Sequence, residues 1–125
     1  MKTPRLLLST LIVVVFWSIP THADHYSSRY AAIAYSQSTC RFGYSHGKRS
    51  RSAAECEATD RCRADDAQVV VWTRNKWCVL ALGDDQQHYG YGWGSSASRA
   101  KSIALRQVRE RTTGCYIAAC VYAGG

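Results

Sequence analysis

The sequence lacks the short motifs by which many enzymes are recognised. It has no Gly-x-Ser-x-Gly nucleophile turn, no His-Glu-x-x-His zinc helix and no Cys-x-x-Cys pair. It also lacks the Lys-Ser/Thr step of a phosphate-binding loop and the glycine spacing of a dinucleotide site. Its adjacent carboxylates, Asp65-Asp66 and Asp84-Asp85, are typical of turns, whereas a calcium loop needs alternate ones. We therefore expect neither a metal ion nor a cofactor.

Histidine is also scarce, with four in the whole chain. His25 lies beside the expected end of a leader segment, whereas His46 and His88 lie in expected strands. Two histidines close to Lys or Arg can carry the acid–base chemistry of a ribonuclease. Nothing in the sequence places His46 next to His88, so catalysis is an alternative hypothesis here and not the leading one.

The chain begins with the three-part pattern of a secretory signal peptide. A basic start is followed by an apolar run over residues 6–17 and by small residues before position 24. The run is shorter than the roughly 20 residues of a membrane-spanning helix. We therefore predict a signal peptide over residues 1–23 and a single exported domain over residues 24–125. The protein is then periplasmic or secreted, with no membrane segment in its mature part.

All six cysteines lie in the predicted exported domain. An even number of cysteines in a small domain of an oxidising compartment is typical of disulfide bonds. The sequence does not choose among the possible pairings. The disulfide candidates are Cys40, Cys56, Cys62, Cys78, Cys115 and Cys120.

The charge of the chain is strongly positive, at +7, and the domain stays basic when the leader is removed. A basic exported domain can bind nucleic acid, anionic lipid, cell wall or an acidic protein. The ordinary charge scatter of a small soluble domain is an equally good explanation of this composition.

The exported domain contains an internal repeat at an offset of 47 residues. The segment AIAYS, which starts at Ala32, aligns with VLALG, which starts at Val79. Likewise RFGYSHG from Arg41 aligns without a gap with HYGYGWG from His88. Identity is low, but the classes of residue are kept over roughly forty positions, as expected for two copies of one structural unit. The predicted copies span about residues 30–73 and 77–122.

Each copy is predicted to form two strands, a helix and a final strand, from the spacing of its apolar residues. In the second helix Ala100, Ala104 and Val108 share one face, which is predicted to pack on a sheet. The predicted fold class is α+β, with two tandem β-β-α-β units that form a mainly antiparallel sheet packed by two helices and cross-linked by disulfides. The expected strands are residues 30–35, 41–46, 68–73, 77–82, 88–93 and 115–122, and the expected helices are 51–63 and 97–111.

The stretch HYGYGWGSS over residues 88–96 alternates glycine with aromatic residues. Such a strand before a helix could hold an anion, but glycines at two matching positions of the first copy favour a role in strand packing. The aromatic side chains share one face of an alternating strand and, if exposed, form a patch suited to a protein partner or to stacked bases. With arginines of the following helix, the predicted surface consists of Tyr89, Tyr91, Trp93, Arg99, Arg106 and Arg109.

Several segments together resemble domain of unknown function 4189, a family of small exported bacterial domains. They are AAIAYS, FGYSHG and SAAECEA in the first copy, and ALGDD, YGYGWG and SRAKSIAL in the second. The resemblance covers about residues 30–121 and implies a disulfide-bearing α+β repeat domain that is secreted or periplasmic. It implies no catalytic or binding residue.

The leading hypothesis is a non-enzymatic periplasmic or secreted module that binds another protein. A concrete form is an immunity or inhibitor protein against an antibacterial effector in the cell envelope, since a basic face suits an acidic partner. Nucleic acid is the less favoured partner. The alternatives are a small basic nuclease-like toxin that uses His46 or His88, and an exported effector that acts on a host.

Overall fold

The computed structural model describes residues 27–124, so the predicted signal peptide lies outside the described residues. Both halves of the described chain fold in the order strand, strand, helix, strand, and each element begins and ends within two residues of its predicted bounds. Within the described range, no helix is long and apolar enough to cross a membrane. The elements are β1 (Tyr30–Tyr35), β2 (Phe42–Lys48), α1 (Arg51–Cys62), β3 (Gln68–Arg74), β4 (Trp77–Gly83), β5 (Tyr89–Gly94), α2 (Ala97–Arg109) and β6 (Cys115–Tyr122).

Hydrogen bonds join the strands into two sheets, each of three antiparallel strands. The first sheet has the order β2-β1-β3 and the second the order β5-β4-β6. The predicted α+β class with two helices is confirmed, but the expected single sheet is wrong. The central strands β1 and β4 explain this, because they are buried on both faces. A single sheet with both helices on one side would leave the other apolar face in water.

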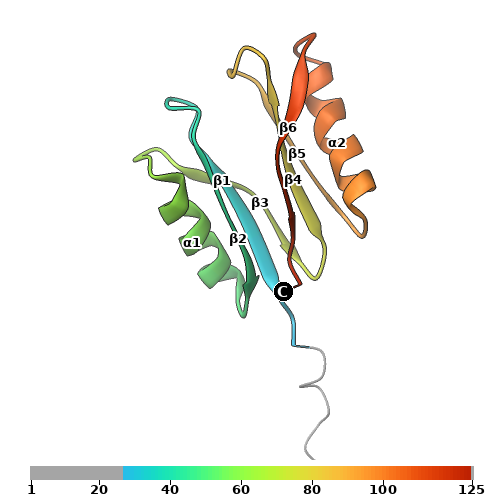
Figure 1. The fold of residues 1–125 in the computed structure, drawn as a ribbon. Coiled ribbons are helices and arrows are strands. Elements are labelled where there is room, and N and C mark those ends of the chain that lie inside the picture. Colours follow the sequence, from blue (N-terminus) through green and yellow to red (C-terminus); the bar gives the residue numbers. More distant parts are fainter. Residues whose placement is uncertain (1–26, 125) are drawn as a thin grey trace, which may run out of the picture.

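The two sheets pack face to face, and one helix covers the outer face of each sheet. Figure 1 shows these four layers in the order α1, first sheet, second sheet and α2. The two helices run in the same direction along the sandwich. As a result, α1 and α2 both begin at the end where β3 turns into β4.

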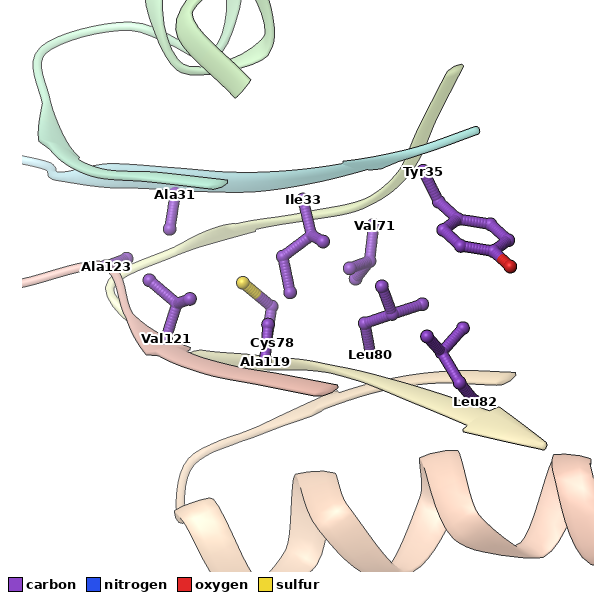
Figure 2. Packing of buried hydrophobic residues seen from close by; sticks show 10 residues of the cluster. All are labelled: Ala31, Ile33, Tyr35, Val71, Cys78, Leu80, Leu82, Ala119, Val121 and Ala123. Carbon is purple, nitrogen blue, oxygen red and sulfur yellow. The ribbon is translucent and has the colours of Figure 1, made fainter. Parts of the chain in front are cut away.

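An apolar cluster between the two sheets forms the main core (Figure 2). Tyr35 reaches across this core, and its hydroxyl donates to the carbonyl of Gln86 at 2.9 Å. Burial raises the pKa of Tyr35 to about 12, and the hydrogen bond to Gln86 ties the β4–β5 turn to the first sheet. The buried members of the cluster are Ala31, Ile33, Tyr35, Val71, Cys78, Leu80, Leu82, Ala119, Val121 and Ala123.

Each helix contacts its sheet mainly through small residues. Ala54 and Ala58 of α1 are fully buried on the first sheet, and alanines of α2 do the same on the second. The backbones therefore approach closely. A Cβ added at Gly43 would lie 2.3 Å from the Cys62 amide nitrogen, and one added at Gly92 would lie 2.1 Å from the Ala100 carbonyl oxygen. No side chain fits at either glycine.

Both helices begin at a serine cap. The Ser50 hydroxyl accepts a hydrogen bond from the Ala53 amide at 3.0 Å, and the Ser96 hydroxyl accepts one from the Arg99 amide at 3.2 Å. The last serine of HYGYGWGSS therefore serves as a helix cap. Neither helix has an acidic residue in its first turn, so the positive ends of both helix dipoles are left without a carboxylate there.

Replacement of Gly92 by alanine tests the close contact between β5 and α2. The new methyl group would overlap the Ala100 carbonyl, which is backbone and cannot rotate away, so we expect the free energy of unfolding to fall by about 3 kcal/mol. Gly94→Ala is the matched control, because its added Cβ would lie no closer than 3.5 Å to the Arg99 side chain. Urea unfolding measures both, and equal stability of the two variants would contradict the packing.

Candidate binding surface

The predicted aromatic residues lie on β5, an edge strand of the second sheet. Gly90 and Gly92 face α2, since a Cβ at either would overlap a carbonyl oxygen of that helix. Because side chains alternate along a strand, Tyr89, Tyr91 and Trp93 project from the opposite face. The glycines of this stretch therefore decide on which side of the sheet its aromatic rings lie.

The three aromatic residues differ in their environment. Tyr89 is partly buried at the edge of the core, where its ring centroid is 5.2 Å from that of Tyr35. Tyr91 exposes 41% of its surface and Trp93 exposes 53%. Of the predicted patch, Tyr91 and Trp93 are thus available to a partner, whereas Tyr89 mainly supports the core.

The three predicted arginines lie on α2, on the other side of the second sheet from these rings. The stem of Arg99 packs near Gly94, so this side chain reaches the end of β5. Arg106 and Arg109 are exposed further along the helix. The β5 backbone lies between them and the aromatic side chains, so the structure does not bring all six predicted residues together on one face.

The cations nearest to the exposed indoles come from other elements. Lys76, in the β3–β4 turn, has its ammonium nitrogen 5.1 Å from the centroid of the Trp93 ring. Arg51, at the start of α1, has its guanidinium carbon 4.2 Å from the centroid of the Trp72 ring. Trp72 and Trp93 line one groove of about 650 Å³. Its lining consists of Trp72, Thr73, Arg74, Asn75, Lys76 and Trp93.

Arg74 and Lys76 are not among the residues predicted for the surface, although the segment WTRNKW at residues 72–77 carries a usable signal. A short polar segment between two predicted strands forms their turn, so its cations lie at the end of the sheet. The register of β5 against β4 pairs Gly94 with Trp77 and thus brings Trp93 beside that turn. A register of this kind cannot be read from the sequence alone.

A second groove, of about 520 Å³, lies where β2 meets β6. Tyr44 and His46 line it from the first sheet and Tyr122 from the second. Its lining contains no Lys or Arg in the described part of the chain. Of these two grooves, the one between Trp72 and Trp93 combines aromatic with cationic side chains.

The structure does not bring the two candidate catalytic histidines together. His46 lies beside the start of β1, whose Ala32 pairs with Ser45. His88 follows the β4–β5 turn, which contacts the far end of β1 through Tyr35. The stretch of β1 from Ala32 to Tyr35 separates the two histidines. It is about 10 Å long, because a strand rises about 3.3 Å per residue. The His88 ring instead contacts Asp85, with Nδ1 2.7 Å from the carboxylate.

All six cysteines are free thiols in the structure. Cys78 is fully buried between the sheets, and burial raises its pKa to about 11, so its thiol stays protonated and unreactive. Among residues 27–124, no group of three His, Cys, Asp or Glu side chains is placed to hold a metal ion.

One aspartate of each adjacent pair binds a turn, in agreement with the turn role predicted from the sequence. Asp66 accepts hydrogen bonds from the Ser36 hydroxyl at 2.5 Å and the Ser38 amide at 3.3 Å. Hydrogen bonding lowers the pKa of Asp66, and the bond from Ser36 has the largest effect. Asp85 accepts from the backbone amide of His88, and the contact with the His88 ring lowers its pKa. These carboxylates have structural roles at the end of the molecule opposite the β3–β4 turn.

The fold and surface define a four-layer α+β sandwich domain with an aromatic and cationic groove at one end. The family described as a domain of unknown function (DUF4189) matches residues 30–121. The chain therefore belongs to this family, as its resemblance predicts. No curated protein and no solved structure matches the chain in the comparisons made.

The lowered pKa of Asp66 predicts a specific acid dependence of stability. A carboxyl with a lower pKa in the folded state stabilises the fold above its unfolded-state pKa, and this contribution is lost as the pH falls through the folded-state pKa. Asp66→Asn keeps an acceptor for Ser36 but removes the titration, so the free energy of unfolding should depend less on pH between about pH 5 and pH 2. Asp65→Asn, which keeps both serine bonds, is the control. An equal loss of slope in both variants would contradict the assignment.

Proposed function

We propose that the chain is an exported, non-enzymatic module that binds another protein. The observation that carries this proposal is the exposure of Tyr91 and Trp93 on an edge strand. Tyr and Trp are enriched among the residues that dominate the binding energy of protein interfaces. Rings of this kind supply a large contact area at a low cost in side-chain entropy.

The strand that presents these rings is held against α2 by close contacts and a hydrogen bond. Gly90 and Gly92 lie against α2, and the side-chain oxygen of Gln107 accepts a hydrogen bond from the Tyr91 amide at 3.1 Å. This bond uses an amide that an edge strand would otherwise offer to another strand. A partner would therefore meet a preformed set of side chains, which favours binding by side-chain contact over addition of a strand.

A concrete form of the proposal is an immunity or inhibitor protein against an effector in the cell envelope. The signal-peptide pattern over residues 1–23 supports a periplasmic or secreted location, where such an effector acts. The positive charge of the chain supports an acidic partner, because opposite charge speeds association and rejects other partners.

We also propose that the two halves are copies of one unit. The order of elements is the same in both, and the sequence offset of 47 places Gly43 on Gly90. Both glycines lie in direct contact with the helix of their own half. At the position that matches Gly92, the first half has Ser45, whose buried hydroxyl donates to the Ala54 carbonyl at 2.6 Å. Small residues thus occupy equivalent contacts in both halves.

Among the disulfides expected in an oxidising compartment, we propose the pair Cys40 and Cys62. Both cysteines line one shallow groove at the end of α1. The Cys62 thiol also donates to the carbonyl of Arg41, the residue next to Cys40, at 3.4 Å. Cys56, by contrast, is exposed on α1.

Oxidation of the purified full-length chain tests this pairing. Peptide mapping should recover Cys40 joined to Cys62, and Cys40→Ser should lower the free energy of unfolding of the oxidised protein by about 3 kcal/mol. Cys56→Ser is the control and should change stability by no more than about 0.5 kcal/mol. Recovery of Cys62 joined to a different cysteine would contradict the proposed pair.

Capture with the tagged full-length chain tests the proposed binding function. The chain is exported by a bacterial host grown with competing bacteria, and proteins retained through a salt wash are identified by mass spectrometry. The wild type should retain one stoichiometric envelope protein, and Tyr91→Ala/Trp93→Ala should lower its recovery about tenfold. The control is Tyr116→Ala/Tyr122→Ala, which removes two tyrosines that are 42% and 44% exposed on β6.

Two results would overturn the proposal. In the first, the wild type and the Tyr91/Trp93 variant retain the same proteins in the same amounts. In the second, the purified chain cleaves RNA and loses this activity in His46→Ala or His88→Ala, which would establish the nuclease alternative.

A further inference from the structure

The charges of the domain are unevenly distributed along the sandwich. Both helices begin, and β2, β3, β5 and β6 end, at the lower end of the molecule in Figure 1, which we name the basic end. The carboxylates at this end are Glu55 and Glu57, and both are engaged, Glu55 by Arg51 and Glu57 by Lys48 at 2.8 Å. The basic residues there are Arg29, Lys48, Arg49, Arg51, Arg74, Lys76, Arg99 and Lys101.

The opposite end of the sandwich is close to neutral, because carboxylates and arginines are mixed there. Its carboxylates include the turn aspartates, such as Asp66 and Asp85, that bind local backbone amides. The net positive charge of the described chain is thus concentrated at the basic end. The acidic residues of the opposite end are Asp60, Asp65, Asp66, Asp84, Asp85 and Glu110, and its arginines are Arg41, Arg61, Arg63, Arg106, Arg109 and Arg111.

The groove between Trp72 and Trp93 opens at the basic end, and its turn is held in place by several bonds. Asn75 has a left-handed backbone (φ 55°), its amide donates to the Arg29 carbonyl at 2.9 Å, and its side-chain oxygen accepts from the Arg29 amide at 2.8 Å. The Arg74 Nε donates to the Ser28 hydroxyl at 2.7 Å, which leaves the outer guanidinium nitrogens free for a ligand. The cations of the groove are therefore positioned before any partner binds.

The contacts of the two indoles favour a protein partner over stacked bases. The Trp72 ring is stacked against Tyr30, with centroids 6.4 Å apart, and also carries the Arg51 guanidinium. The Trp93 ring carries the Lys76 ammonium. A nucleic-acid base would have to compete with these groups for the ring faces that they contact. The exposed parts of the rings remain suited to apolar side chains, and the cations to carboxylates.

We infer that the groove between Trp72 and Trp93 binds an acidic segment of the partner protein, with Arg74 and Lys76 pairing its carboxylates. This inference rests on the proposed function and adds to it the groove and the two cations that would bind an acidic partner. The volume of about 650 Å³ is within the range of ligand-binding clefts. Within residues 27–124 neither Arg74 nor Lys76 forms an ion pair, so both charges are available.

A fluorescein-labelled peptide of alternating Glu and Ser is the probe that tests this inference. Its anisotropy is measured against the full-length chain at about 150 mM salt, where long-range attraction is screened beyond about 8 Å. Binding to Arg74→Gln/Lys76→Gln should be weaker by about fivefold to tenfold. The matched control, Arg109→Gln/Arg111→Gln, removes the same charge from the opposite end and should stay within about twofold of the wild type.

Three results would overturn the inference. The first is an equal loss in both double variants, which would show a response to net charge alone. The second is no binding of the Glu-Ser peptide above that of a Gln-Ser peptide. The third is tighter binding of oligothymidylate or of phosphatidylglycerol vesicles than of the peptide. If the peptide test fails but recovery of the captured protein still depends on Tyr91 and Trp93, the proposed function stands. The capture experiment does not vary Arg74 or Lys76, so the two failures can be told apart.

Discussion

Each helix lies in close backbone contact with the strand beneath it, and this contact determines which face of that strand can carry side chains. Gly43 in the first half and Gly90 and Gly92 in the second let the helix backbone lie directly on the strand. Large side chains are thereby excluded from the positions of β2 and β5 that face the helices. On β5 the aromatic side chains project to the inner side of the sheet, where Tyr89 borders the core and Tyr91 and Trp93 stay exposed. Tyr91 and Trp93 are surface residues for this reason.

The parallel direction of the two helices concentrates charge at one end. Each helix follows the second strand of its own half, so Arg49 and Arg51, which lie around the start of α1, are at the same end as the β3–β4 turn with Arg74 and Lys76. Asp66 and Asp85 occupy turns at the other end, where they bind backbone amides. These carboxylates and the groove proposed to bind a partner thus lie at opposite ends of the domain. A partner with carboxylates would approach the end where no free carboxylate of the described chain repels it.

Much of the fold follows from the sequence, because alternation and helical periodicity define elements that the structure reproduces. The single-sheet expectation fails at β1, since a strand buried on both faces has no alternation to show which layer covers each face. The surface was only partly predictable. Periodicity placed Tyr91 and Trp93 on one face, but the pairing of Gly94 with Trp77, which brings Lys76 to Trp93, depends on register. Arg106 and Arg109 were included in the predicted surface because they are close to β5 in the sequence. In the structure the second sheet lies between these arginines and the aromatic rings.

The most direct test of the account is a chemical-shift map of the isotope-labelled full-length chain titrated with the Glu-Ser peptide. The largest amide shifts should fall on residues 72–76 and 91–94, with small shifts along both helices. Shifts that centre on the opposite end, around Asp66 and Asp85, or on the uncharged groove beside Tyr44 and Tyr122, would contradict it.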